Sequence, residues 1–330
     1  MARGRIVKRP QGLTLIELLV ALALAAALSA AMVATYANSR RNHFYEQQVA
    51  RLQENGRHAL RLLTRDLALA GFHAGTIGAP LPPAQPVAVD CADAPWALAS
   101  DLPLEPVDDW AGRGDPITVT GRSLRCLPTA DLAPGSDLLA LRRTAAAPAQ
   151  FLGTPAPSLT PSAVLRWYLR VEDGIPVRWE QLEARDIVAG RHSAAGVSLW
   201  PAVARIYSVQ RGTGGVPQLC AETLAGNRMV SRCLVEGVEH LQIEYGVDTN
   251  GDGTAEQYLA APAVGELPGV VAARVHLLLR SIRPVSGYSD RHPHTLGATR
   301  IPAGNDGYLR RVFSQTVVLG NGVQQLGRSS

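Results

Sequence analysis

The feature that most constrains this chain is an apolar run near its N-terminus. Residues 13–37 are 25 consecutive positions in which Glu17 is the only charged side chain. A helix of about 20 apolar residues crosses the hydrocarbon core of a bilayer, which is about 30 Å thick. The run therefore predicts a membrane-spanning helix, with the rest of the chain folded on one side of the membrane.

Positive charge is concentrated ahead of this run. The first twelve residues contain Arg3, Arg5, Lys8 and Arg9 and no acidic residue. The positive-inside tendency keeps such a leader in the cytoplasm and exports the residues after the span. These four charges equal the net charge of +4, so the remaining chain is balanced. Nucleic acid is not expected as a partner, because phosphate recognition needs a concentrated basic surface.

A short motif lies where the leader meets the span. Residues 12–18 read Gly-Leu-Thr-Leu-Ile-Glu-Leu. This motif resembles the Gly-Phe-Thr-Leu-Ile-Glu-Leu signature of type IV prepilins and type II secretion pseudopilins. The resemblance implies that prepilin peptidase cuts after Gly12 and that the new N-terminal amine, on Leu13, is methylated. Leucine stands where phenylalanine is commonest, which exchanges one apolar residue for another.

Glu17 is the unusual residue of the span. A carboxylate inside a membrane costs several kcal/mol unless it is paired, hydrated or protonated. The resemblance implies that Glu17 meets the N-terminal amine of a neighbouring subunit during assembly. The competing interpretation is a charge tolerated near the edge of the span.

The helix is expected to continue beyond the span with a different surface. Between residues 38 and 72, apolar residues recur at helical spacing among charged and polar ones. They are Val49, Leu52, Leu60, Leu63, Leu67 and Ala70. Gly71 is a natural stop signal for this helix. We therefore predict a leader at residues 1–12, a transmembrane half-helix at 13–37 and an amphipathic half-helix at 38–72.

Residues 73–330 are expected to form a strand-rich periplasmic head. Residues 73–161 hold 14 of the 23 prolines, which excludes long helices there. Runs rich in Val, Ile, Leu and Tyr predict strands. These runs are residues 138–141, 164–171, 203–209, 241–247, 271–280 and 312–319. The predicted fold class is α+β, with a long N-terminal helix packed on a largely antiparallel sheet.

The chain has four cysteines, Cys91, Cys126, Cys220 and Cys233. An even number in an exported chain favours disulfides. Three complete pairings exist, and loop-closure entropy favours joining Cys91 to Cys126 and Cys220 to Cys233. Buried free thiols are the alternative.

One loop of the head has the composition of a calcium site. The stretch Asp-Thr-Asn-Gly-Asp-Gly places oxygen donors at Asp248, Asn250 and Asp252. Leu259 stands at the twelfth position, where an EF-hand has a bidentate glutamate, and Glu256 is the available substitute. The alternative is a hairpin turn rich in Asn, Asp and Gly, without a metal. Both interpretations stay open at this point.

Short segments of the head resemble the PilW family of minor pilins. They are residues 53–60, 65–72, 234–239, 245–248 and 310–313. The resemblance implies a type IV pilus minor pilin, anchored in the inner membrane before assembly and exposed on the pilus at the cell surface afterwards. It implies that the protein helps to start or cap the pilus. The implied partners are other minor and major pilins, prepilin peptidase and a tip adhesin.

Two alternatives remain. The first is a minor pseudopilin of a type II secretion system, which has the same leader and helix. The second is a head that acts as an adhesin or DNA-uptake module, which a basic groove or an exposed aromatic row would support. An enzyme is not expected, because the sequence contains no nucleophile elbow, phosphate-binding loop or HExxH motif.

Overall fold

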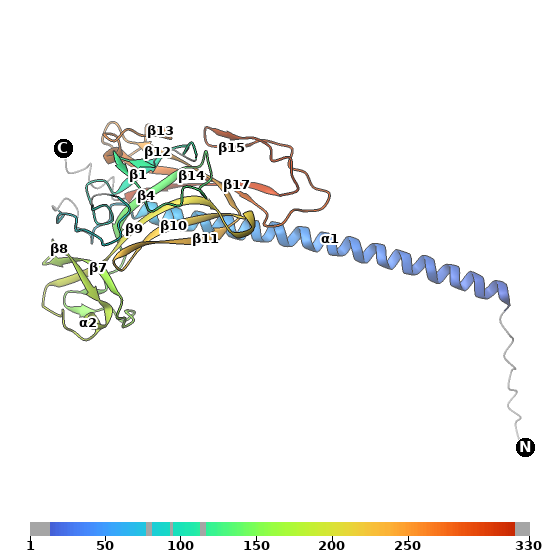
Figure 1. Ribbon diagram of the computed structural model, residues 1–330, viewed down its shortest axis with the longest axis horizontal. Coiled ribbons are helices and arrows are strands. Elements are labelled where there is room, and N and C mark those ends of the chain that lie inside the picture. The colour runs from blue at the N-terminus through green and yellow to red at the C-terminus, as the bar shows by residue number, and fades with distance from the viewer. Residues whose placement is uncertain (1–13, 77–80, 93–94, 113–116, 321–330) are drawn as a thin grey trace, which may run out of the picture. The chain divides into compact units, whose positions relative to one another are not determined.

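The computed structural model describes residues 14–76, 81–92, 95–112 and 117–320. The chain forms two compact units, residues 1–49 and 50–330. Helix α1 (Leu15–Ala68) contributes residues to both units, and the strands belong to the second (Figure 1).

The first unit is described by the N-terminal part of α1. Its apolar side chains are exposed, and Leu15, Leu24 and Val33 have exposed fractions of 79%, 61% and 68%. The mean hydropathy reaches 2.3 over 18 residues, none of which is buried. Among the described residues this is the one helix that is long and apolar enough to cross a membrane. Such a surface is costly in water, at about 25 cal/mol per Å², so it needs lipid or neighbouring helices.

The C-terminal part of α1 is amphipathic, as predicted. Leu52, Leu60, Leu63 and Leu67 are buried in the second unit, between polar residues that face outward. The helix ends at Ala68, four residues before the predicted boundary at residue 72, and Gly71 follows in a turn with φ of 73°.

The head contains two main antiparallel sheets. In the larger sheet the strand order is β1-β4-β9-β10-β11, with four short or peripheral strands attached. These five strands are β1 (Leu104–Val107), β4 (Leu138–Thr144), β9 (Val197–Arg211), β10 (Pro217–Ala225) and β11 (Arg228–Glu236). The smaller sheet has the order β13-β12-β14-β17. Its strands are β13 (Gln257–Leu259), β12 (Val238–Val247), β14 (Val270–Arg280) and β17 (Arg310–Val318).

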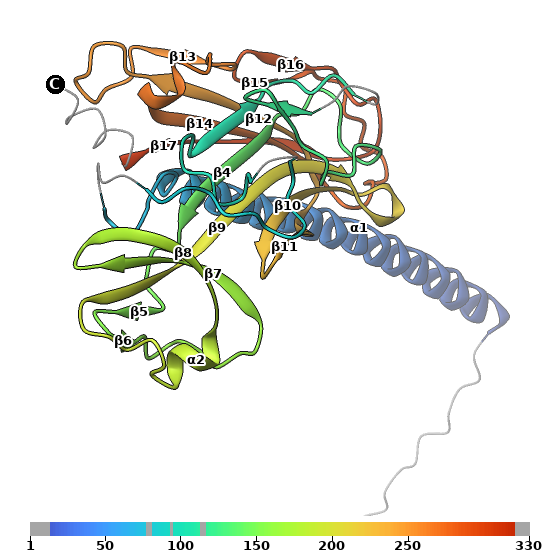
Figure 2. The same ribbon diagram turned by 60° about the vertical axis from the view of Figure 1, so that its left-hand side comes forward.

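The long strand β9 also carries a projection, seen around α2 in Figure 2. The projection consists of β5 (Gln150–Phe151), β6 (Thr154–Pro155), β7 (Leu165–Glu172), β8 (Ile175–Glu183) and α2 (Ala184–Val188). The remaining short elements are β2 (Thr118–Val119), β3 (Arg122–Ser123), β15 (His294–Leu296), β16 (Thr299–Ile301), η1 (Thr213–Gly215) and η2 (Leu267–Gly269).

Every strand predicted from the apolar runs overlaps an observed one, but among the strands of nine residues or more β8, β10 and β11 were not predicted. Strand β8 contains Pro176 near its start, which weakens a strand signal. Strand β11 pairs only with β10 in its sheet, and most of its side chains are exposed. An edge strand of this kind has little of the hydrophobic alternation on which sequence prediction depends.

Aromatic residues and disulfides stabilise the interior of the head. Three tryptophans are buried in one core cluster and the other two pack against it. They are Trp96, Trp110, Trp179, Trp167 and Trp200. The disulfides join Cys91 to Cys126 and Cys220 to Cys233, which confirms the sequence-local pairing. The second bridge links β10 to β11 at directly opposite positions.

Gly56 lies where α1 meets the smaller sheet. A Cβ atom at this position would come within 2.6 Å of the Phe313 ring on β17. The glycine therefore permits the close approach of helix and strand. Asn55 donates a hydrogen bond of 2.9 Å to the carbonyl of Glu236 on β11, so adjacent helix residues contact both sheets.

A buried ion cluster joins the same helix to the larger sheet. Asp66 has an exposed fraction of 1% and lies 2.6 Å from Arg143 of β4 and 2.7 Å from Arg205 of β9. Tyr207 donates a further hydrogen bond of 2.7 Å to the same carboxylate. Burial by itself would raise the pKa of Asp66, but the two guanidinium groups and the tyrosine outweigh it and lower the pKa below 3.8.

We expect Asp66→Asn to lower the free energy of unfolding by about 3–5 kcal/mol, because it leaves Arg143 buried without a counter-charge. The stabilisation requires an ionised Asp66, whose pKa is lower in the folded than in the unfolded state. It is therefore fully present above about pH 4 and is lost as the pH falls through the folded-state pKa. Urea unfolding of the full chain in detergent, followed by tryptophan fluorescence at several pH values, measures both effects.

The matched control is Asp186→Asn, which breaks an ion pair of similar length with Arg191. Arg191 is 70% exposed there, so the expected loss is at most about 1 kcal/mol. Equal losses in the two variants would show that the Asp66 cluster has no special role.

Candidate functional site

The predicted processing junction borders the described residues. Gly12 and Leu13 lie outside the part of the chain that the structure describes, and the description begins at Thr14. Cleavage after Gly12 and methylation of Leu13 therefore stay predictions.

Thr14 and Glu17 form a reciprocal cap at the start of α1. The backbone N–H and the hydroxyl of Thr14 each donate a hydrogen bond of 2.8 Å to Oε2 of Glu17. The backbone N–H of Glu17 donates to the hydroxyl of Thr14 at 3.4 Å. This arrangement is a capping box, which satisfies N–H groups that have no partner inside the helix. This role of Thr14 was not predicted, although the Thr-x-x-Glu spacing is the sequence signature of a capping box.

The cap leaves part of the Glu17 carboxylate available. Both hydrogen bonds from Thr14 fall on Oε2, and Oε1 accepts none within the described part of the chain. The carboxylate is therefore oriented by its own chain while one oxygen can accept a further donor. An ammonium group is the donor that would also neutralise its charge.

The loop predicted to bind calcium connects β12 to β13. Val247 and Gln257 are opposite each other in the two strands, so the intervening residues form a hairpin loop. The carboxylate of Asp248 accepts hydrogen bonds from the backbone N–H groups of Asn250, Gly251 and Gly253, at 3.1, 2.6 and 2.7 Å. The segment is therefore a hairpin turn, a geometry that fits the loop with a metal as well as without one.

The same loop brings the predicted ligands together. One oxygen each from Asp248, Asp252 and Glu256 lies within 4.8 Å of the others. The amide nitrogen of Asn250 donates to Asp252 at 3.2 Å and to Glu256 at 2.9 Å. Hydrogen bonds from Thr254 hold the pKa of Asp252 below its ordinary value, so this carboxylate is charged at neutral pH. The oxygen-rich set suits calcium, and calcium binding stays a prediction.

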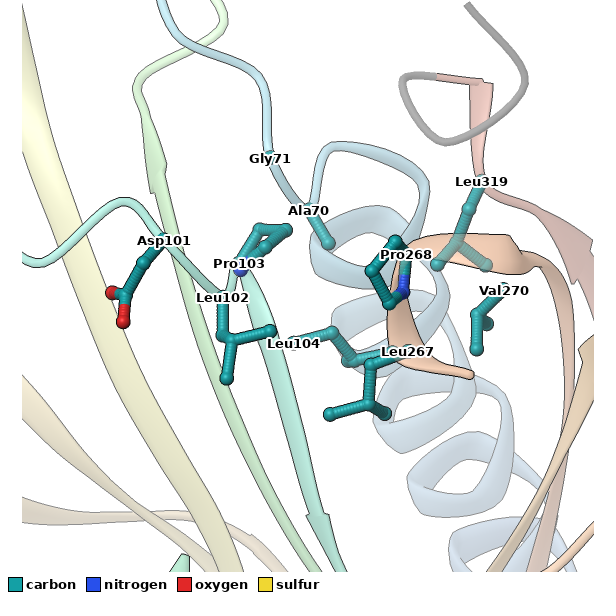
Figure 3. Close-up of a pocket in the computed structure, with 10 residues that line it drawn as sticks. All are labelled: Ala70, Gly71, Asp101, Leu102, Pro103, Leu104, Leu267, Pro268, Val270 and Leu319. Carbon is teal, nitrogen blue, oxygen red and sulfur yellow. The ribbon is translucent and has the colours of Figure 1, made fainter. Parts of the chain in front are cut away.

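A small cavity lies at the end of α1 in the second unit, and Figure 3 shows its apolar side chains. Its volume is about 50 Å³. The lining includes Ala70, Leu104, Leu267, Val270 and Leu319. Apolar cavities of this kind are packing gaps that stay dry unless an apolar molecule fills them. At this volume it is far below the about 300 Å³ at which ligand pockets begin, so it does not indicate a ligand site.

Two parts of the chain match known families. Residues 7–33 match the prokaryotic N-terminal methylation motif. Residues 206–321 match the family described as Type IV pilus-assembly protein W. No curated protein and no solved structure matches the chain.

The two matches fall on different structural features. The methylation motif covers residues 7–12 of the leader, the Thr14–Glu17 cap and the apolar part of α1 as far as residue 33. The second match begins within β9 and includes the β10–β11 hairpin and all four strands of the smaller sheet. Three of the segments that resembled PilW in the sequence, residues 234–239, 245–248 and 310–313, lie inside it.

We expect calcium to stabilise the β12–β13 hairpin through Asp248, Asn250, Asp252 and Glu256. Binding to the folded state alone adds about 2.7 kcal/mol when calcium exceeds its dissociation constant 100-fold. Thermal melts of the full chain in detergent, with calcium at about 1 mM or with chelator, measure the difference. The variant with Asp252→Asn and Glu256→Gln should lose this contribution, and an unchanged calcium response in it would rule out binding at the loop.

Proposed function

Because the chain is a prepilin-like protein with a PilW region, and so a type IV pilus minor pilin, we propose that it helps to start pilus assembly or forms part of the pilus tip. One observation carries this proposal: a methylation motif at residues 7–33 and a PilW match at residues 206–321 occur in one chain. Both families point to a structural component of the pilus.

The proposal includes a route through the membrane. The basic leader stays in the cytoplasm, prepilin peptidase cuts between Gly12 and Leu13, and the apolar part of α1 anchors the protein in the inner membrane. The head lies in the periplasm before assembly and on the pilus afterwards. The two disulfides support an oxidising compartment for the head.

The proposed partners are the other minor pilins, the major pilin and a tip adhesin. The exposed apolar side chains of the first unit support helix-to-helix contacts with them, because this surface needs a new apolar environment when the subunit leaves the lipid. A type II secretion pseudopilin would share this helix, and the PilW match favours the pilus. The tryptophans do not support the adhesin alternative, because all five pack in or against the core.

We expect the mature protein to begin at Leu13, because the motif places the cleavage site before the apolar run. N-terminal sequencing of the protein from purified inner membranes decides this, and mass spectrometry should detect one added methyl group. A mature N-terminus that follows the apolar run would contradict the proposal, and so would an intact Met1.

We expect Glu17→Val to leave membrane insertion and cleavage intact, since the span becomes more apolar. Incorporation into pili should fall at least tenfold, because a lost ion pair worth about 1.4 kcal/mol changes an equilibrium by that factor. The amounts of mutant and wild-type protein in inner membranes and in sheared pili measure the effect.

The matched control is Glu54→Val, which changes an exposed glutamate of the same helix outside the apolar run. It should be incorporated as well as wild type. If Glu17→Val were also incorporated normally at equal expression, Glu17 would have no role in assembly of this subunit.

A further inference from the structure

The last strand of the smaller sheet, β17, has an open outer edge. It pairs only with β14, through nine consecutive residue pairs without a register shift. Ser314, Gln315 and Thr316 are exposed, and Val318 is 63% exposed. The strand contains no proline, and residues 312–318 carry no charge. A long, regular and uncharged edge of this kind is a site where a further strand can add to a sheet.

The other sheet edges of the head are blocked. Strand β1 has four residues, one of them Pro106, and β13 has three residues. Strand β8 contains Pro176, and its pairing with β7 has a register shift. Strand β11 also has a register shift, and Val89 and Asn55 form hydrogen bonds with its two ends. Short length, proline, bulges and covered ends are the devices that prevent strand addition. Among the described edge strands of nine residues, β17 is the one that has none of them.

Hydrogen bonds at both ends of β17 show which backbone groups face outward. The N–H of Ser281 donates to the carbonyl of Leu309 at 2.8 Å, and the N–H of Leu319 donates to the carbonyl of Val271 at 2.8 Å. The odd-numbered residues of β17 therefore bond to the β14 side, because bonding alternates along an antiparallel strand. The N–H and C=O groups of the even-numbered residues from 310 to 318 point away from the sheet. They form a row of donors and acceptors that a further strand can use.

Helix α1 runs along this edge strand. The ring of Phe313 packs against Gly56 of the helix. Leu319, directly after β17, lines one cavity with Ala70, directly after α1 (Figure 3). The odd-numbered side chains of β17 therefore face the helix. A strand added at the edge would direct every second side chain to the same side, because side chains alternate across a sheet.

The exposed surface of α1 beside β17 is basic. Between residues 50 and 70 the exposed charged residues are Arg51, Arg57, Arg61 and Arg65, with Glu54 as the one acid. Arg57, Arg61 and Arg65 are four residues apart, so they form a row along the helix. Acidic side chains on an added strand would be attracted to this row. A second copy of β17 would instead bring a second basic helix, which like charge disfavours.

We propose that the outer edge of β17 binds an extended acidic segment of another protein by strand addition. Main-chain hydrogen bonds to the even-numbered residues of β17 hold the segment, and its carboxylates meet Arg57, Arg61 and Arg65. The uncharged stretch 312–318 accepts the neighbouring side chains without repulsion. This inference goes beyond the role in the pilus and does not depend on it, because the binding is a property of the purified chain.

The test starts with the full chain in detergent and a phage library of random peptides about ten residues long, enough to span an edge strand. Selected peptides should alternate β-branched with acidic residues. The best of them, labelled with a fluorophore, is the probe for anisotropy titrations. Thr316→Pro should weaken its binding about tenfold or more, because it removes an N–H that points away from β14. The matched control Thr316→Val keeps this N–H and should bind as wild type does.

The charge of the helix is tested separately. Arg57→Glu combined with Arg61→Glu should weaken binding of the same peptide about tenfold or more, because repulsion replaces attraction. The control Arg166→Glu reverses an exposed arginine on β7 and should leave the affinity unchanged.

Peptides methylated on alternate amide nitrogens test the strand geometry on the unaltered protein, so the result does not depend on how well Thr316→Pro folds. One set of methylated positions should abolish binding and the other should not. The proposal is overturned if no peptide is selected, if the selected peptides have no excess of acidic residues, or if both methylated sets bind equally. It is also overturned if the wild-type chain dimerises and Thr316→Pro makes it monomeric, since a second copy then occupies the edge.

Discussion

The head depends on the ion cluster around Asp66. This carboxylate is carried by α1 and is reached by Arg143 from β4 and by Arg205 and Tyr207 from β9. A buried ion pair gives little net stability compared with apolar packing, but breaking one is costly. The main effect of the cluster is therefore to fix the position of α1 on the larger sheet. Only one register of the helix brings the carboxylate of Asp66 to the two arginines and the tyrosine. The close contact between Gly56 and Phe313 imposes a similar requirement on the smaller sheet.

Helix α1 therefore has two parts with different surfaces, one that exposes apolar side chains and one that packs in the head. Its N-terminal part exposes apolar side chains and carries Glu17, whose carboxylate is oriented by Thr14 through one of its two oxygens. Its C-terminal part buries an apolar face in the head. A subunit built in this way can transfer from lipid to a bundle of neighbouring helices while the folded head stays unchanged, which is what filament assembly requires.

Acidic and basic residues are nearly equal in number in the head, and several of the buried ones form ion pairs. Glu105 meets Arg142 and Asp290 meets Arg310, each inside the protein.

The sequence alone determined the apolar run, the leader motif, the amphipathic face of the helix, six of the strands and the turn residues of the loop at Asp248, because each is a local pattern of hydrophobicity, charge or turn residues. The sequence-local disulfides also followed from loop-closure entropy. The tertiary structure alone decided the partners of Asp66, which lie 77 to 141 positions away along the chain. It also decided strands β8, β10 and β11. These features depend on which strands pair and in which register, and periodicity within a segment carries no information about a neighbour that is distant in the chain.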